Sequence, residues 1–117
     1  MITAAPLRSL LFVPGDSERK QAKALQARAD ALILDLEDSV AEAALPTARA
    51  RVRDFLAAQA PERRSQQLWV RPNSLGSGKL VEDLTAVIAG RPDGIVLPKV
   101  SAVREVQEVG PASFRRD

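Results

Sequence analysis

The chain has 117 residues, a formal charge of +2, 45% hydrophobic residues and only 3% aromatic residues. It contains no cysteine and no histidine, which excludes disulfides, thiolate zinc sites, a histidine base and a Ser-His-Asp triad. Because no basic stripe is interleaved with aromatics and no apolar run approaches the ~20 residues of a membrane span, we expect no nucleic-acid partner, no membrane insertion and a cytoplasmic location.

The first part of the chain predicts two strands separated by a helix. Residues 8–15 predict a strand that ends at a Pro-Gly break. Asp16 or Ser17 can cap the following helix, whose apolar face is predicted to consist of Ala22, Leu25 and Ala29. Residues 31–38, ALILDLED, begin as an apolar run and end with three carboxylates in four positions. This pattern is typical of a buried parallel strand whose carboxyl end opens on a site.

Two more strand–helix units and a further helix follow. Pro46 and Thr47 open a second helix, with an apolar face of Ala48, Val52, Phe55 and Leu56. Residues 60–65 form a polar connector, and residues 67–71 predict the third strand. The third helix has the apolar face Leu80, Leu84, Val87 and Ile88, and residues 95–97 predict a fourth strand. Ser101 can cap a last helix carrying Val103 and Val106, which Gly110-Pro111 ends; residues 112–117 show no periodicity.

Four strand–helix alternations predict an α/β fold with a parallel sheet and right-handed crossovers. Such units of roughly 25 to 35 residues make about half of the ~250 residues of an eight-stranded barrel. The chain is therefore either a small open sheet or the N-terminal half of a TIM (β/α)₈ barrel. We expect one domain over residues 1–117, with a divergent tail at 110–117.

Charged side chains gather where the predicted strands end. The four carboxyl ends are Pro14-Gly15-Asp16, Glu37-Asp38, Arg71-Pro72-Asn73 and Pro98-Lys99, and in a parallel sheet they share one face. Arg71 could clamp a substrate carboxylate, with Glu37 or Asp38 left for a proton or a metal. In the alternative interpretation, Glu37 and Asp38 are loop acids, Arg71 is their surface partner, and Lys23 and Lys99 are solvated. No phosphate-binding glycine motif supports a nucleotide site.

Four segments, residues 8–15, 29–40, 68–73 and 93–100, together resemble the citrate lyase beta subunit. This is the CitE-like branch of the HpcH/HpaI aldolase/citrate lyase superfamily, which includes malyl-CoA lyases. The segments have the family's order and spacing and cover residues 8 to about 106. The resemblance implies a Mg²⁺-dependent barrel enzyme that makes or breaks a carbon–carbon bond between an acyl thioester and an α-keto acid. Its partners would be an acyl-CoA or acyl-carrier-protein thioester and the keto acid, and full-length relatives are expected to form homo-oligomers.

The resemblance also assigns roles to individual residues. Arg71 matches the arginine that binds the keto-acid carboxylate. Glu37 and Asp38 match an acidic pair that orients metal, water or Arg71. Phe12 and Lys23 match positions near the CoA moiety, and Lys99 is a further substrate-binding candidate.

Departures from the family pattern limit these expectations. The family's Mg²⁺ ligands, a Glu and an Asp, follow the fourth strand and would lie beyond residue 117, so none is expected in this chain. Ser101 stands where an acid is usual, Pro72 replaces a commonly apolar residue, and residues from 110 onward do not continue the pattern.

These departures favour a truncated, inactive enzyme fragment. Unpaired edges on the first and fourth strands would make it marginally stable or self-associating. The alternatives are a non-catalytic α/β binding module that retains part of the CoA and keto-acid site, or an aldolase that forms a Schiff base on Lys99.

Overall fold

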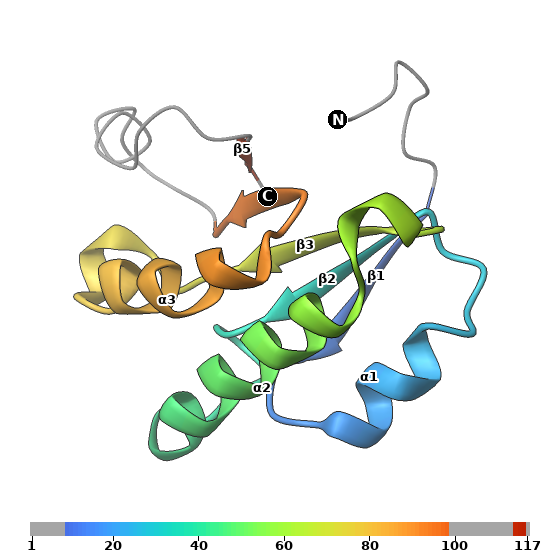
Figure 1. Cartoon of the computed structure of the whole chain (residues 1–117). Helices are drawn as coiled ribbons and strands as arrows, with labels where there is room; N and C mark the ends of the chain where they lie inside the picture. Colours follow the sequence, from blue (N-terminus) through green and yellow to red (C-terminus); the bar gives the residue numbers. More distant parts are fainter. Residues whose placement is uncertain (1–8, 99–113, 117) are drawn as a thin grey trace.

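The computed structural model describes residues 9–98 and the backbone of residues 114–116. It contains a parallel sheet whose strands follow one another in sequence order (Figure 1). The strands are β1 (Leu10–Pro14), β2 (Ala31–Asp35), β3 (Gln67–Arg71), β4 (Gly94–Leu97) and β5 (Phe114–Arg116). The predicted α/β fold with four successive parallel strands is confirmed.

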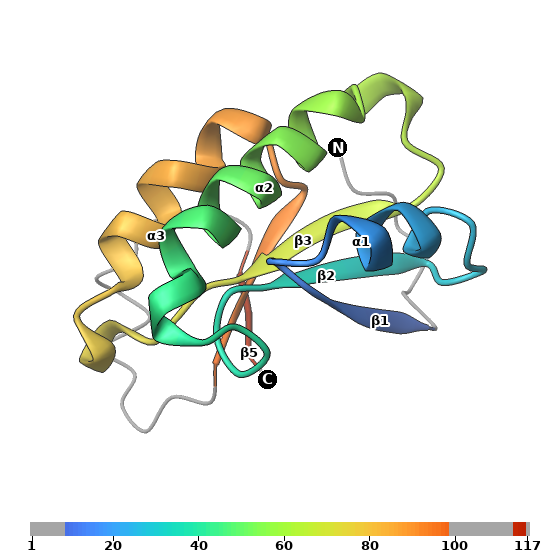
Figure 2. The same cartoon turned by 90° about the horizontal axis from the view of Figure 1, so that it is seen from below.

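Within residues 9–98, three α-helices cover the same face of this sheet (Figures 1 and 2). They are α1 (Glu18–Ala24), α2 (Leu45–Ala58) and α3 (Leu80–Val87), joined by the short 3₁₀ helices η1 (Glu42–Ala44), η2 (Pro61–Arg63), η3 (Leu75–Ser77) and η4 (Ile88–Gly90). A doubly wound sheet would carry helices on both faces, whereas a barrel carries them only outside. The arrangement is therefore that of the first β/α units of a (β/α)₈ barrel.

The main core lies between the sheet and the helices. Leu32 and Leu34 of β2 point into it and meet Val52 and Leu56 of α2. Because side chains alternate along a strand, the intervening residues point to the other face. There Ile33 joins a smaller buried cluster with Ala31, Trp69 and Val96. Strand β2 is buried on both faces, as the uninterrupted apolar run predicts.

The buried face of α1 differs from the prediction. Ser17 caps this helix as expected, since its Oγ accepts from the Lys20 amide. The buried residues of the helix are Gln21 and Ala24, however, whereas Ala22 and Leu25 are exposed. Ala29, which follows the helix, is partly buried and packs against the core as predicted. The Gln21 amide donates to the carbonyls of Pro14 and Gly15, each at 3.0 Å. A polar residue thus takes a core position, which hydrophobic periodicity cannot reveal.

A similar exchange occurs on α3. Leu80 and Val87 are buried as predicted, but the third buried residue is Asp83, and Ile88 lies in η4 with 58% of its surface exposed. Helix α2 agrees with its prediction: Ala48, Val52 and Leu56 are buried, and Pro46 lies in the first turn.

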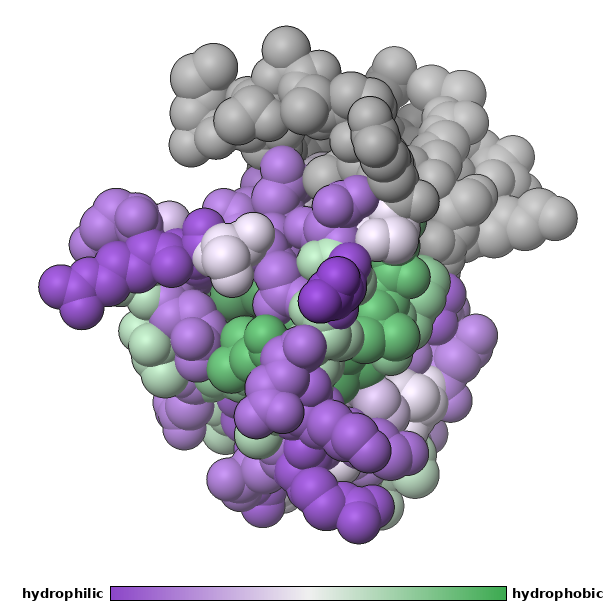
Figure 3. Space-filling view, turned by 90° about the vertical axis from the view of Figure 1, so that its right-hand side faces the viewer, coloured by the Kyte–Doolittle hydropathy of each residue, from purple (hydrophilic) through white to green (hydrophobic). Residues whose placement is uncertain are grey.

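The prediction that the fourth strand has an open edge is wrong. Strand β5 pairs with it in parallel, with Ile95 opposite Phe114 and Leu97 opposite Arg116. Strand pairing is made by backbone groups and not by side chains. Residues 114–116 show no hydrophobic periodicity, so the sequence did not predict this strand. Strand β1 forms the other edge. Its Leu10, Leu11 and Phe12 are exposed, and Figure 3 shows hydrophobic surface on that side of the molecule.

The predicted last helix with Ser101, Val103 and Val106 lies outside the described residues. Among the residues described, none of the helices combines the length and apolar character needed to cross a bilayer.

Candidate functional site

The carboxyl ends of the first three strands place two charged residues side by side. Pro14, Asp35 and Arg71 are consecutive register partners across β1, β2 and β3. Asp35 and Arg71 are the last residues of β2 and β3. Two positions before them in each strand lie Ile33 and Trp69, which belong to the smaller cluster on the face opposite the helices. By strand alternation Asp35 and Arg71 belong to the sheet face opposite the helices.

The Arg71 guanidinium and the Asp35 carboxylate form a two-point ion pair. Arg71 Nε lies 3.0 Å from Asp35 Oδ1, and Nη2 lies 3.2 Å from Oδ2. Asp35 is 2% exposed, and the Arg71 side chain is 14% exposed. Paired N–H donors on two carboxylate oxygens give a geometry that only arginine supplies.

The turn after β2 donates hydrogen bonds to the same carboxylate. Asp35 Oδ1 also accepts from the Glu37 amide at 2.9 Å, while Oδ2 accepts from the Ser39 amide at 3.0 Å and the Ser39 hydroxyl at 2.7 Å. Burial by itself raises the pKa of Asp35, but the Arg71 guanidinium and these donors outweigh it and hold the pKa below its ordinary value. Asp35 is therefore ionised at neutral pH.

Three further side chains surround Arg71. Glu37 Oε1 lies 3.6 Å from its Nε, and Asp38 Oδ2 lies 3.6 Å from its Nη2. The Phe12 ring faces the guanidinium, with Arg71 Cζ 4.6 Å from the ring centroid, a cation–π geometry. Glu37 and Asp38 thus lie beside Arg71, as expected, and both form ion pairs with its guanidinium.

A hollow opens beside this group, with a cavity volume of about 360 Å³. It is lined by Phe12, Val13, Pro14, Asp35, Asp38, Ser39 and Arg71. An apolar wall, one guanidinium and a hydroxyl are suited to a small organic acid, because the guanidinium can hold a carboxylate while the aromatic ring covers its carbon atoms.

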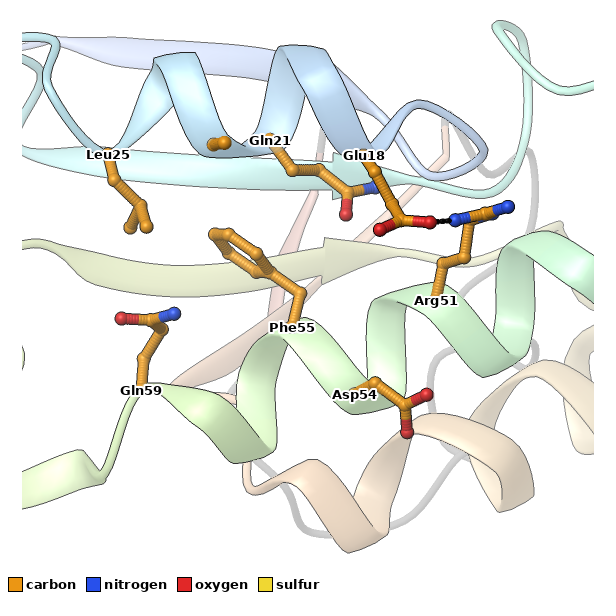
Figure 4. A pocket seen from close by; sticks show the side chains of 8 residues that line it. Glu18, Gln21, Leu25, Arg51, Asp54, Phe55 and Gln59 are labelled. Carbon is orange, nitrogen blue, oxygen red and sulfur yellow. Dashed lines mark ion pairs between the residues drawn. The ribbon is translucent and has the colours of Figure 1, made fainter.

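A second groove of similar size, about 380 Å³, lies between α1 and α2 on the helical side of the sheet. In Figure 4, Phe55 and Leu25 point toward one another across it, and Glu18 pairs with Arg51 at one end. Its arginine pairs with an acid of the neighbouring helix, and neither Arg71 nor the residues described around it line this groove.

The structure brings together some of the predicted site residues. Arg71, Glu37, Asp38 and Phe12 meet as described. Lys23 is exposed on α1 and does not line the hollow. Lys99 lies outside the described residues.

Asn73 was expected at the same cleft, and this prediction is wrong. Its amide donates to the Leu36 carbonyl at 3.0 Å and to Asp83 Oδ2 at 2.9 Å. The Asn73 side chain is therefore held toward α3, where the buried Asp83 needs donors, and not toward Arg71.

Asp35 is the site residue that sequence reasoning missed. A signal was present, because Asp35 is the first of the three carboxylates and the only one inside the apolar run. A charge buried in a strand requires a partner, and the nearest candidate was the arginine at the end of the next strand.

The acids described here do not fit a magnesium centre. Within residues 9–98 no cluster of three His, Cys, Asp or Glu side chains is disposed to hold a metal ion. Asp35, Glu37 and Asp38 instead all face the Arg71 guanidinium, whose positive charge would repel a divalent cation.

Comparison with known proteins adds independent findings. Residues 8–117 match the HpcH/HpaI aldolase/citrate lyase family. The chain is 41% identical over 102 residues to citrate lyase subunit beta of Escherichia coli K12, covering 87% of this chain and 33% of that protein. It is 39% identical over 106 residues to (3S)-malyl-CoA thioesterase of Cereibacter sphaeroides, covering 91% of this chain and 36% of that protein.

A solved structure agrees with these sequence matches. The citrate lyase beta subunit of M. tuberculosis, solved with oxaloacetate and magnesium, superimposes with a TM-score of 0.77 at 36% identity, over 92% of this chain and 45% of that one. The chain thus spans about a third of the length of the curated relatives it matches, and somewhat less than half of this solved chain.

Proposed function

The chain belongs to the HpcH/HpaI aldolase/citrate lyase family, and we propose that it supplies the carboxylate-binding part of a carbon–carbon lyase. The substrate would be the CoA or acyl-carrier-protein thioester of a hydroxy acid such as citryl-CoA or malyl-CoA. Its cleavage would release an acyl thioester and a keto acid. The keto acid would be held at the carboxyl ends of β1, β2 and β3.

One observation carries the proposal: Arg71 lines the hollow at the strand ends, where Asp35 binds one edge of its guanidinium and the Phe12 ring packs against it. A guanidinium held in this way can bind the carboxylate of a keto acid with little loss of side-chain freedom. The relatives support the choice of ligand, since one is named for citrate, another for malyl-CoA, and a third was solved with oxaloacetate.

The described residues would bind and orient the keto acid, and they supply no metal site. Magnesium is present with oxaloacetate in the M. tuberculosis neighbour, but Asp35, Glu37 and Asp38 are paired with Arg71 here. We therefore assign no step of the reaction through a metal held by these residues. Homo-oligomeric assembly and a cytoplasmic location belong to the same proposal.

The direct test is titration of the chain with oxaloacetate, followed by calorimetry and by ¹H–¹⁵N spectra. We expect saturable binding that Arg71→Lys weakens at least tenfold, because lysine keeps the charge and loses the planar fork. Arg63→Lys is the control, since Arg63 is exposed in η2 and does not line the hollow at the strand ends. Equal affinity of the wild type and Arg71→Lys would refute the proposal.

A second assay separates binding from catalysis. Malyl-CoA and citryl-CoA are incubated with the chain and Mg²⁺, and release of acetyl-CoA is measured. Cleavage would support a lyase activity of this chain. Oxaloacetate binding without cleavage would favour the alternative of a non-catalytic module that retains the carboxylate site.

A further inference from the structure

Asp35 occupies an unusual place for a residue beside an anion-binding arginine. It is a full negative charge, 2% exposed, in direct contact with the cation that would bind the substrate. On charge alone, Asp35 should weaken the attraction of Arg71 for a carboxylate. Its presence therefore calls for a compensating role.

The contacts of Asp35 define the orientation of the guanidinium. Both carboxylate oxygens are used, one on Nε and one on Nη2, so the fork cannot rotate about the Cδ–Nε bond without losing a hydrogen bond. The Phe12 ring lies against the guanidinium at 4.6 Å and restrains its plane from a second direction.

The carboxylate that provides this restraint is itself fixed. Its oxygens receive the amides of Glu37 and Ser39 and the Ser39 hydroxyl, at 2.7 to 3.0 Å. Its backbone is in register with Arg71 across two hydrogen-bonded strands. Asp38, whose Oδ2 lies 3.6 Å from Nη2 and whose side chain is 79% exposed, offers no comparable restraint.

We propose that Asp35 is the positioning residue of the carboxylate site, which directs the Nε–Nη2 edge of Arg71 inward and presents the rest of the guanidinium to the keto acid. The inference rests on the proposed function, since it concerns the same ligand. It assigns to Asp35 the role that the resemblance to the family gave to Glu37 and Asp38.

The test compares Asp35→Asn with the wild type by two measurements, the affinity for oxaloacetate and the exchange of the Arg71 Nε–H proton with water. We expect Asp35→Asn to bind oxaloacetate about tenfold more weakly and the Nε–H proton to exchange faster. An unchanged or tighter affinity together with unchanged exchange would overturn the inference, because charge removal alone favours anion binding.

Asp93→Asn is the matched control. Asp93 also pairs with an arginine, Arg64, at 3.2 Å, and accepts a backbone hydrogen bond from Leu68 at 2.7 Å. It immediately precedes β4, at the opposite end of the sheet from Arg71. This variant removes the same charge and a comparable ion pair, so a general loss of stability would appear in both variants, whereas faster Arg71 exchange is expected only in Asp35→Asn.

Ser39→Ala keeps the inference testable if Asp35→Asn does not fold. Ser39 is exposed, and its hydroxyl donates to Asp35 at 2.7 Å, so the variant loosens Asp35 without removing a charge. Faster Arg71 exchange is expected, and exchange as slow as in the wild type would count against the inference. The exchange measurement needs no ligand. Absence of any oxaloacetate binding by the wild type would therefore refute the proposed function separately.

Discussion

Trp69 of β3 and Gly94 of β4 are register partners, and the six-membered ring of Trp69 lies directly over the glycine. The ring is 3% exposed, and its Nε1 donates to Gln67 at 2.9 Å. Trp69 precedes Arg71 by two positions and lies on the same face of the strand. The large ring therefore fills the layer next to the candidate site, and it can do so because the neighbouring strand has no side chain at that point.

Gly94→Ala is expected to displace this ring. A Cβ atom at Gly94 would lie 2.3 Å from Cζ3 of Trp69, which is far inside contact distance. Overpacking of this kind costs about 1–3 kcal/mol of unfolding free energy. Because Trp69 is the single tryptophan of the chain, chemical denaturation followed by fluorescence reports both the stability and the environment of the ring. A variant with unchanged emission and midpoint would show that the ring does not pack as described.

The Asp35–Arg71 pair makes stability depend on pH in the acid range. Because the pKa of Asp35 is lower in the folded chain than in the unfolded one, its stabilisation is complete above the unfolded value of about 3.9. It is lost as the pH falls through the depressed pKa. The free energy of unfolding of the wild type should therefore approach that of Asp35→Asn as the pH falls from about 4 through the depressed pKa. Urea denaturation over this range measures the difference, and a constant difference would contradict the shift.

Substitution of Arg64 is expected to lower the stability of the fold strongly. Its side chain is only 4% exposed and donates to the carbonyls of Leu56, Gln59, Gly90 and Arg91. These carbonyls belong to the ends of α2 and η4. Arg64→Ala leaves several of them without donors and should cost on the order of 3 kcal/mol. Arg63→Ala, at an exposed neighbouring position, is the control and should change the denaturation midpoint little.

Asp83 should be needed for the placement of the loop after β3. It is fully buried, and it accepts hydrogen bonds from Arg49 Nε at 2.8 Å and from the backbone N–H of Asn73 at 2.7 Å. Asp83→Ala leaves Arg49 without its buried partner, and removal of one member of such a pair costs about 3–5 kcal/mol. The adjacent Glu82 also pairs with Arg49, but at 3.6 Å with 74% of its side chain exposed. Glu82→Ala is the matched control, and thermal melts with similar shifts for both variants would argue against the buried network.

Much of the fold follows from local patterns. The apolar runs at β2, β3 and β4, the Ser17 cap and the Pro46 helix start all appear where predicted. These elements depend on residues close together in the chain, where strand burial and helix capping leave a direct mark on the sequence. The four family segments likewise singled out Arg71, and Glu37, Asp38 and Phe12 lie around it in the structure; its role in binding a keto acid stays a prediction.

The tertiary structure decided which polar groups meet. Gln21 and Asp83 occupy core positions because partners from other segments satisfy them. Asn73 is turned away from the site for the same reason. The pairing of Arg71 with Asp35 joins residues 36 positions apart, through the register of two parallel strands. Periodicity reports whether a position is buried on average, whereas a buried charge or amide is stable only with a specific partner, and that partner is defined when distant strands and helices come into contact.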